Sequence, residues 1–315
     1  MKISVLDKST LGEDLDISPL YAYGETVIYD KTSPEEVASH IGDADAVFVN
    51  KVKLNRTNLL NATNLKIICE AATGYDNIDL DYCKEAGIAV CNVPAYSANS
   101  VSQVTVAMVM SLATHIPEYN RCVSSGDYTK SGIPNKLTPV FHELCGKKWG
   151  IIGYGNIGKK VGDVARALGC EIMVYKRTPE DGVNCVDIDT LLRESDIISV
   201  HLPHTPETDK IIDERRISLM KKDTIFVNVA RGKVCDEEAL CRAVLENKIR
   251  AIGVDVYSTE PFGEDSPYNL IMDRDNVCLT PHMAWGAYEA RLRCFNIMLE
   301  NLTSFIKGEE KNRIV

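Results

Sequence analysis

One stretch in the middle of the chain, Lys147–Gly158, constrains the fold more than any other. It contains a short apolar strand pattern that runs directly into G-x-G-x-x-G, followed by a helical pattern with Ile157, Val161, Val164, Ala165 and Leu168 on one face. This order of strand, turn and helix is the context in which such glycines bind a dinucleotide. Gly153 would allow the tight turn, Gly155 the approach of a pyrophosphate, and Gly158 the close packing of helix on strand. The stretch therefore predicts a parallel α/β domain with a phosphate site at the N-terminus of a helix.

The residues after the next strand indicate which dinucleotide is bound. That strand is expected at Glu171–Tyr175, and an acidic residue usually follows it and binds the ribose 2′-hydroxyl of NAD. Here the strand is followed by Lys176, Arg177 and Thr178. Two cations and a hydroxyl suit a 2′-phosphate, because charged donors form strong hydrogen bonds to phosphate oxygens. The sequence thus favours NADP over NAD, and a solvated basic turn is the alternative interpretation.

The composition indicates an ordinary globular protein of two domains. The chain has 315 residues, of which 45% are hydrophobic and 25% charged, as is typical of such proteins. The formal net charge of -10 argues against nucleic acid as the main partner, and no apolar run approaches the ~18 residues of a membrane span. The 11 scattered cysteines, without C-x-x-C, predict reduced thiols of which nearly all are buried, no disulfide framework and no metal site. Because the N-terminal strand is too soon charged for a secretory signal, we expect a cytoplasmic protein.

The first part of the chain alternates strand and helix patterns. Strands are predicted at Lys2–Leu6, Thr26–Tyr29, Ala46–Val49, Leu65–Cys69 and Ile88–Cys91, and helices at Pro34–Ile41 and Asp79–Glu85. Short units of this kind predict a small flavodoxin-like domain with a parallel sheet. Ligands of such sheets bind beyond the carboxyl ends of the strands, where Asn50 and the Thr73-Gly74 turn are expected. Ordinary loop chemistry is the alternative for both.

The rest of the chain predicts a second domain and a return to the first. Further strands are expected at Asp196–Leu202, Ile249–Val256 and Asn276–Thr280, and a strand leading into a turn at Thr224–Gly232. Helices are expected at Ser100–His115, Asp189–Glu194, Glu237–Leu245 and Tyr288–Lys307. Residues 117–139 show little periodicity and are interpreted as a dimer arm or an extended surface loop. The last helix is expected to close the first domain. The predicted fold is α/β with two Rossmann-like domains and parallel sheets, a discontinuous substrate domain (1–97 plus 287–315) and a dinucleotide-binding domain (98–286).

Three ionisable residues follow predicted strands of the second domain. Arg231, Glu260 and His282 are expected near the edge of the sheet where a ligand binds. Arginine can hold a carboxylate by two hydrogen bonds, histidine can transfer a proton, and a carboxylate can orient the histidine ring. With a nicotinamide cofactor, this set suits hydride transfer to a 2-keto acid. His201 and His204 compete with His282 for the proton-transfer role, and sequence position does not separate them.

The motifs taken in order resemble the D-2-hydroxyacid dehydrogenase family over nearly the whole chain. The matching stretches are Ala72–Asp79, Gly153–Gly158, His201–Pro203, Thr205–Thr208, Asn228–Gly232, Gly253–Val256, Glu260-Pro261 and Thr280–His282. The resemblance implies that Arg231 binds the substrate, that His282 is the acid/base, and that Glu260 is its partner.

The same resemblance implies two sets of binding residues. The cofactor would be bound by Gly153, Tyr154, Gly155, Asn156, Ile157, Gly158, Lys176, Arg177, Thr178, Leu202, Pro203, Thr208, Val229, Ala230, Asp255 and His282. The substrate would be bound by Asn50, Thr73, Gly74, Arg231 and Trp285. Asp255 is expected at the nicotinamide carboxamide, and the backbone around Thr73 and Gly74 at the substrate carboxylate.

Asn50-Lys51, Ala72–Tyr75 and Trp285 resemble the glycerate dehydrogenase branch, whose members reduce hydroxypyruvate or glyoxylate. The family is usually dimeric through the segment that follows the Ser100 helix, which implies a homodimer here. The alternatives are a D-lactate or other D-2-hydroxyacid dehydrogenase, an NAD-dependent hydrolase of the related formate or homocysteine type, and a catalytically idle dinucleotide sensor. The presence of Arg231, Glu260 and His282 argues against the sensor.

Overall fold

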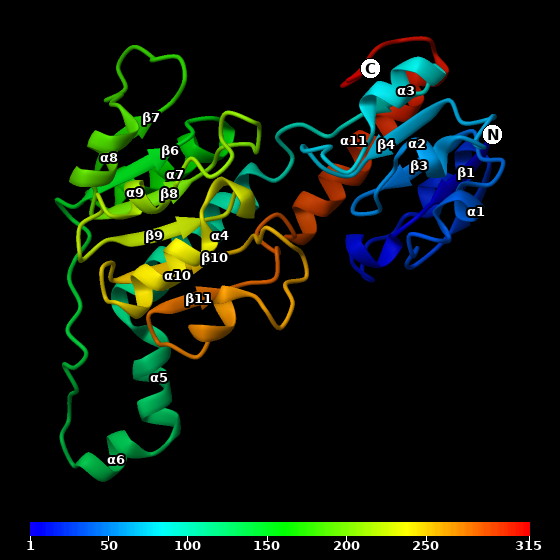
Figure 1. Cartoon of the computed structure of the whole chain (residues 1–315). Helices are drawn as coiled ribbons and strands as arrows, with labels where there is room; N and C mark the ends of the chain where they lie inside the picture. The colour runs from blue at the N-terminus through cyan, green and yellow to red at the C-terminus, as the bar shows by residue number, and fades with distance from the viewer. The chain divides into compact units, whose positions relative to one another are not determined.

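The computed structural model describes residues 1–315 and divides the chain into two compact units (Figure 1). The smaller unit comprises Met1–Ser97 and Gly286–Val315, and the larger unit comprises Ala98–Trp285. Each unit is built on one sheet whose paired strands all run parallel. The predicted fold class, α/β with two parallel sheets and a discontinuous smaller part, is confirmed. None of the helices combines the length and the apolar character that crossing a membrane requires.

The sheet of the smaller unit has the strand order β2-β1-β3-β4-β5, which is flavodoxin-like. Its strands are β1 (Lys2–Val5), β2 (Glu25–Ile28), β3 (Ala46–Val49), β4 (Ile67–Glu70) and β5 (Ala89–Cys91). Every residue of β3 and β4 is buried, as expected of central parallel strands. The C-terminal tail returns to the edge of this sheet, where Ile314 donates its backbone N–H to the carbonyl of Val90 at 2.7 Å.

The helices of the smaller unit are α1 (Val37–Ile41), α2 (Arg56–Leu59), α3 (Leu80–Ala86) and the long α11 (Tyr288–Ile306), with 3-10 turns η1 (Lys8–Leu11) and η2 (Ser18–Tyr23). The Asp79 side chain caps α3, and left-handed Gly87 ends it. The predicted start of α1 at Pro34 was wrong by three residues. Ser33 donates its backbone N–H to the Glu36 carboxylate at 3.1 Å, but the residues between them form a turn.

The sheet of the larger unit has the order β11-β10-β9-β8-β6-β7. Its strands are β6 (Lys148–Ile152), β7 (Glu171–Tyr175), β8 (Ile197–Val200), β9 (Ile225–Asn228), β10 (Ala251–Val254) and β11 (Val277–Leu279). A single parallel bridge between Val174 and Cys185 extends the sheet beyond β7. With this bridge the order is that of a dinucleotide-binding fold, and the order reverses beside β6, where such folds bind their ligand.

Helices cover both faces of this sheet (Figure 1). On one face α4 (Ala98–Thr114) packs on α7 (Asn156–Ala167), and both contact the strands. On the other are α8 (Ile188–Glu194), α9 (Glu214–Ile217) and α10 (Glu237–Leu245), with 3-10 turns η3 (Gly232–Val234) and η4 (Pro267–Leu270). The predicted apolar face of α7 was wrong at Val164, which is 41% exposed. Val161 and Ala165 are buried as expected.

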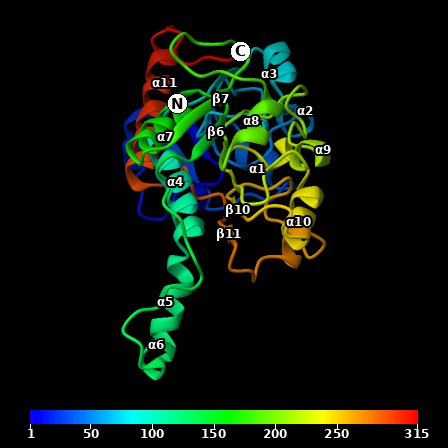
Figure 2. The same ribbon diagram turned by 90° about the vertical axis from the view of Figure 1, so that its left-hand side faces the viewer.

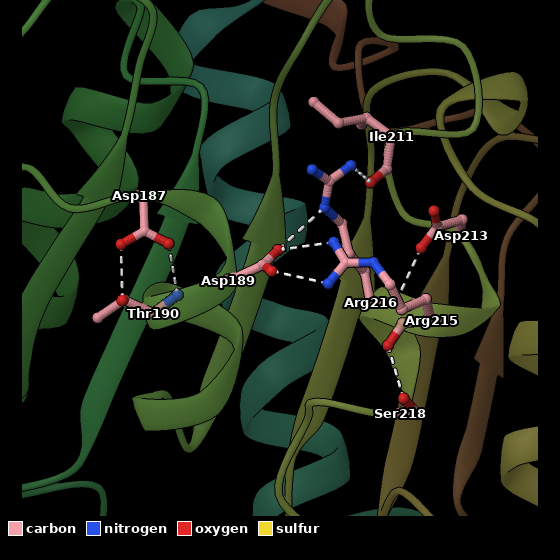
Figure 3. Close-up of polar contacts among 8 residues, drawn as sticks. All are labelled: Asp187, Asp189, Thr190, Ile211, Asp213, Arg215, Arg216 and Ser218. Atoms are coloured by element: carbon pink, nitrogen blue, oxygen red, sulfur yellow. Dashed lines mark hydrogen bonds and ion pairs between the residues drawn. The ribbon is translucent and has the colours of Figure 1, made fainter.

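Ion pairs fasten the short helix α9 to α8 (Figure 3). The Asp189 carboxylate accepts from Arg215 Nη1 at 2.7 Å and Nη2 at 3.0 Å, and also from Arg216 Nε at 3.2 Å. The Arg215 guanidinium lowers the pKa of Asp189 to about 2. Asp213 caps α9 by accepting the Arg216 N–H at 2.8 Å. A helix of only four residues is therefore held by its cap and its neighbour as well as by its backbone.

Residues 116–146 form an arm that extends away from the sheet of the larger unit in both views (Figures 1 and 2). The arm contains α5 (Ile116–Ser124) and α6 (Asp127–Ser131), two helices that the low periodicity of residues 117–139 did not indicate. Neither helix buries a residue. Several apolar side chains of the arm are exposed: Ile116, Val123, Tyr128, Ile133, Leu137, Val140 and Phe141. An arm with this much exposed apolar surface resembles an interaction surface more than a solvated loop.

All 11 cysteines are free thiols. Seven are buried, which agrees with their interpretation as small core residues. The prediction was too broad for the others, because Cys122, Cys185 and Cys278 are half-buried and Cys145 is exposed.

Candidate active site

The glycine pattern forms the turn between β6 and α7. Gly153 has a φ of +93°, and a Cβ there would lie 2.9 Å from the backbone carbonyl of His201. A Cβ on Gly158 would lie 2.2 Å from the carbonyl oxygen of Gly153, so only glycine fits either position without a shift. A Cβ on Gly155 would meet nothing within 4 Å. The turn is therefore packed at its two ends and open in the middle, where the first N–H groups of α7 lack helical partners.

The other residues of the turn differ in what they present. Tyr154 is 7% exposed, and its hydroxyl accepts a hydrogen bond from Arg166 Nη2 at 2.9 Å. Its side chain belongs to the core, so only its backbone is available to a ligand. Asn156 starts α7, and Ile157 packs partly against the core. These positions fit the pyrophosphate of a dinucleotide through backbone groups and the helix N-terminus.

An acidic residue lies at the end of β7, contrary to the expectation that this place is purely basic. Glu180 accepts hydrogen bonds from Lys176 Nζ at 2.6 Å and Lys159 Nζ at 2.8 Å. Arg177 and Thr178 are exposed. The sequence prediction considered only the residues directly after the strand. Because the segment from Lys176 to Glu180 is not helical, no sequence pattern indicated this pair.

The loop after β8 is held by its own side chains. The Thr208 hydroxyl donates to the carbonyl of Pro203 at 2.7 Å and accepts the N–H of Thr205 at 2.8 Å. Leu202 is half-buried against the core, and Pro203 is exposed. The Thr208 side chain thus serves the shape of the loop, and Leu202 and Pro203 line its start.

The three candidate histidines have different surroundings. Burial lowers the pKa of His201 to about 3, and the contact found for its ring is Nε2 with Ser199 Oγ at 3.0 Å. His204 Nε2 lies 2.8 Å from Oδ1 of Asp209, an exposed residue of the same loop. His282 Nδ1 lies 2.6 Å from Glu260 Oε2. Of the three histidines, only His282 therefore contacts a carboxylate that is itself held by backbone just beyond a different strand, namely that of Glu260.

The pair of Glu260 and His282 is built from two neighbouring strand ends. Glu260 Oε1 accepts the backbone N–H of Tyr257, just beyond β10, at 2.9 Å. The Tyr257 hydroxyl donates to the carbonyl of Thr280, just beyond β11, at 2.9 Å. His282 has a φ of +51°, a conformation that is uncommon outside glycine and found at functional sites. The side chains of His282 and Glu260 are 21% and 32% exposed, so the pair is accessible as well as ordered.

Asp255 holds the loop that carries His282. Asp255 is 1% exposed, and its carboxylate accepts hydrogen bonds from Thr280 Oγ1 at 2.6 Å, Met283 N at 2.9 Å and Ala284 N at 2.9 Å. Burial raises the pKa of Asp255, which these hydrogen bonds oppose. The structure therefore gives Asp255 a structural task that the sequence did not predict; the cofactor contact implied by the family resemblance stays a prediction.

Arg231 follows β9, the strand beside β10. The buried Asn228 shapes this turn, because its Oδ1 accepts the N–H of Ala230 at 3.0 Å and its Nδ2 donates to the carbonyl of Arg231 at 3.0 Å. Val229 and Ala230 are each 8% exposed. Arg231 is half-buried, and its Nη1 donates to the carbonyl of Ala230 at 2.8 Å. The guanidinium is thus placed by a rigid turn at the same sheet edge as the Glu260–His282 pair.

Trp285 lies at the end of the larger unit and packs partly against its core. The preceding residue, Ala284, is fixed because its carbonyl accepts the Ser100 hydroxyl of α4 at 2.6 Å.

In the smaller unit, Asn50 is 5% exposed, and its Nδ2 donates to Thr10 Oγ1 at 3.0 Å. The backbone N–H of Asn50 donates to the buried carboxylate of Asp7 at 3.0 Å.

The Thr73-Gly74 turn follows β4. The Thr73 hydroxyl donates to the carbonyl of Val93 at 2.8 Å, and the carbonyl of Thr73 accepts from Asn92 Nδ2 at 2.8 Å. Thr73 is nevertheless exposed and Gly74 half-buried. The turn is therefore fixed at Thr73 while part of it faces solvent.

Taken together, one edge of the sheet in the larger unit carries three features. These are a glycine turn that suits a dinucleotide, the guanidinium of Arg231, and the pair of Glu260 and His282. No group of three or more His, Cys, Asp or Glu side chains is placed to hold a metal ion. The glycine turn fits a dinucleotide, because Gly155 leaves open space in front of the N-terminus of α7. The arrangement can hold an anionic substrate by arginine and move a proton by histidine.

Comparisons with known proteins agree with this chemistry. Residues 106–284 match the family described as "D-isomer specific 2-hydroxyacid dehydrogenase, NAD binding domain". A hydroxypyruvate reductase of Blautia hydrogenotrophica is 38% identical over 99% of both chains. A solved acyclic imino acid reductase in complex with NADPH and D-Arg is 30% identical, with a TM-score of 0.88 over 100% of both chains. The D-lactate dehydrogenase of Aquifex aeolicus, solved with NAD and lactic acid, is 30% identical, with a TM-score of 0.85 over 98% of this chain and 96% of that one.

Proposed function

Because the chain belongs to the D-isomer specific 2-hydroxyacid dehydrogenase family, and is thus an NAD(P)-dependent oxidoreductase of 2-hydroxy and 2-keto acids, we propose that its substrate is hydroxypyruvate, with glyoxylate as a smaller alternative. The products would be D-glycerate and glycolate. The observation that carries the proposal is the 2.6 Å contact between His282 Nδ1 and Glu260, at the sheet edge that also bears Arg231. The likeness to a hydroxypyruvate reductase over 99% of the chain supports the choice of substrate.

Each of the three residues has a defined task in the proposal. Glu260 accepts a hydrogen bond from the Nδ1–H of His282, which fixes the ring and leaves Nε2 to carry the catalytic proton. Nε2 gives this proton to the keto oxygen during reduction and takes it back during oxidation. Arg231 binds the substrate carboxylate by two hydrogen bonds and polarises the keto group beside it. The nicotinamide cofactor, when bound, would supply the hydride to the keto carbon of the substrate, or accept it from that carbon in the reverse reaction.

Further binding residues complete the proposal. In the smaller unit, proposed as the substrate domain (1–97 plus 287–315), Asn50, Thr73 and Gly74 bind the substrate carboxylate. Trp285 limits the size of the substrate side chain. In the proposed dinucleotide-binding domain (98–286), Asp255 contacts the nicotinamide carboxamide besides holding the His282 loop.

For the remaining cofactor contacts we propose the residues along the sheet edge of the larger unit. The backbone of the glycine turn binds the pyrophosphate, and the loop segments around Leu202, Thr208 and Ala230 line the nicotinamide half. Lys176, Arg177 and Thr178 bind a 2′-phosphate, so NADPH is the preferred cofactor and NADH is also accepted. Three cations near the end of β7, Lys159 included, support this preference, because a 2′-phosphate adds up to two negative charges.

The protein is further proposed to be a cytoplasmic homodimer. Its 11 free thiols fit a reducing compartment. The arm exposes apolar side chains such as Leu137 (73%) and Val140 (63%), which a second copy would cover.

A cofactor-oxidation assay over a panel of keto acids tests the proposed substrate. Hydroxypyruvate, glyoxylate, pyruvate and 2-ketoisocaproate are each supplied with NADPH or NADH, and kcat/KM is measured. We expect hydroxypyruvate to rank first and the bulkiest acid last. A higher kcat/KM for pyruvate would instead assign a D-lactate dehydrogenase, and activity that requires added amine would assign an imino acid reductase.

A further inference from the structure

Three charged side chains meet where β7 ends. Lys176 directly follows β7, Lys159 is the fourth residue of α7, and Glu180 lies in the loop after β7. The Glu180 carboxylate uses one oxygen for each lysine, with Oε2 at 2.6 Å from Lys176 Nζ and Oε1 at 2.8 Å from Lys159 Nζ. The side chains of Lys176, Glu180 and Lys159 are 22%, 35% and 49% exposed. Both carboxylate oxygens are thus committed to the two lysines while the site remains open to solvent.

The two ion pairs keep Glu180 charged. The hydrogen bond from Lys159, and then that from Lys176, lower the pKa of Glu180 to about 2. The carboxylate is therefore ionised throughout the physiological range of pH. Any second anion that approaches the lysines meets a fixed negative charge between them.

The location of this group in the fold points to the ligand concerned. β7 lies directly beside β6, which ends in the glycine turn. In dinucleotide-binding folds, the end of the second strand faces the ribose 2′ position, where an acidic residue favours NAD and a cation favours NADP. Lys176 and Lys159 thus lie at the end of the second strand and on the helix that starts at the glycine turn, which is where such folds bind the ribose.

We propose that Glu180 competes with the 2′-phosphate of NADP for Lys176 and Lys159, and so determines how strongly the enzyme prefers NADP to NAD. The proposal rests on the proposed function, since it concerns the same 2′-phosphate site. A 2′-phosphate must share or displace the Glu180 contacts, and it approaches a carboxylate of its own sign. NAD leaves both ion pairs intact. Glu180 therefore reduces a preference for NADP that the surrounding cations create, and the enzyme can use both cofactors.

A substitution that keeps the shape of Glu180 and removes its charge tests the competition. The Kd values of adenosine 2′,5′-bisphosphate and of 5′-AMP are measured by calorimetry on the full chain at low salt, for wild type and Glu180→Gln. We expect the bisphosphate to bind about tenfold more tightly to Glu180→Gln, the scale of one charge at a partly exposed site. The Kd of 5′-AMP should change less than twofold, and added salt should reduce the gain.

Glu194→Gln is the matched control. Glu194 accepts from Lys148 Nζ at 2.7 Å at the opposite end of the sheet strands, so this variant loses a similar ion pair away from the cofactor edge. It should leave both Kd values unchanged. Weaker or unchanged binding of the bisphosphate to Glu180→Gln would overturn the competition. Weaker binding would mean that Glu180 positions the lysines for the phosphate.

The same two Kd values, measured for wild type and Lys176→Met, distinguish a failure of this proposal from a failure of the proposed NADPH preference. If wild type binds 5′-AMP as tightly as the bisphosphate, and Lys176→Met changes neither, the NADPH preference is wrong. The Glu180 proposal still stands in that case if Glu180→Gln gains affinity for the bisphosphate alone. If wild type prefers the bisphosphate and Glu180→Gln gains nothing, the preference stands and the competition is wrong.

Discussion

At the scale of single residues, His282 carries the proton in the proposed reaction. His282→Ala should lower kcat by about 10²–10⁴-fold, because positioned acid–base catalysis contributes about this much. The Kd of NADP, measured by fluorescence titration, should stay within about twofold, since the pyrophosphate turn is unchanged. His204→Ala is the control and should retain near-normal turnover. Loss of turnover in His204→Ala together with an active His282→Ala would reassign the proton transfer.

Arg231 is the second residue with a defined chemical task. Lysine keeps its charge but not its planar pair of donors. Arg231→Lys should therefore reduce kcat/KM for hydroxypyruvate by about 10–100-fold, the value of one charged hydrogen bond. Arg215→Lys serves as the control. It removes a guanidinium of α9 that binds Asp189 of α8 (Figure 3), and it should leave kcat/KM unchanged. An Arg231→Lys enzyme with nearly full activity would show that charge alone is sufficient.

At the scale of elements, the carboxyl end of β4 buries an acid. Glu70 is fully buried; its Oε2 accepts from Asn77 Nδ2 at 3.1 Å, and its Oε1 has no partner. Burial raises the pKa of Glu70 well above its ordinary value of 4.5. Below pH 4.5 the carboxyl is protonated whether the chain is folded or unfolded. As pH rises from there to the folded pKa, only the unfolded chain ionises, so the stability of the fold falls.

Glu70→Gln should remove this loss of stability. We expect its urea midpoint to match wild type near pH 4 and to exceed it near pH 7. Glu13→Gln, at an exposed position of the same unit, serves as the control. A difference between Glu70→Gln and wild type that is the same at both pH values would contradict the account.

Buried strands were predictable because continuous apolar runs end at polar residues, and β3 and β7 match their predicted ranges. The helices α2 and α9 were missed because each has four residues, too few for a periodic pattern. In α5 the pattern was not recognised because no side chain of that helix is buried. Apolar periodicity predicts only those elements that the core itself stabilises.

At the candidate site, too, the sequence indicated individual residues but not the contacts between residues that are far apart in the chain. The sequence placed His282 and Glu260 at strand ends, but 22 residues separate them, and only the fold shows their contact. The fold likewise distinguishes His282 from the half-buried His201, whose pKa burial lowers to about 3. Glu180 was missed because its importance comes from Lys159, which lies 21 residues away on another element.

At the scale of the whole molecule, the arm is expected to form the dimer. The double variant Leu137→Asp/Val140→Asp places two charges on its apolar surface and should convert the protein from twice 34.9 kDa to 34.9 kDa in sedimentation equilibrium. Leu270→Asp, at another residue of the larger unit that is 69% exposed, should leave the dimer intact. A wild type that sediments as a monomer, or a double variant that stays dimeric, would contradict this role of the arm.

The central claim is that this chain transfers a hydride to the keto carbon of hydroxypyruvate. The most direct test incubates the enzyme with NADPH and hydroxypyruvate, follows oxidation of the cofactor, and resolves the product by chiral chromatography. The account predicts one molecule of D-glycerate for each NADPH consumed. Oxidation of NADPH without glycerate, formation of the L-isomer, or no reaction with this acid would contradict it.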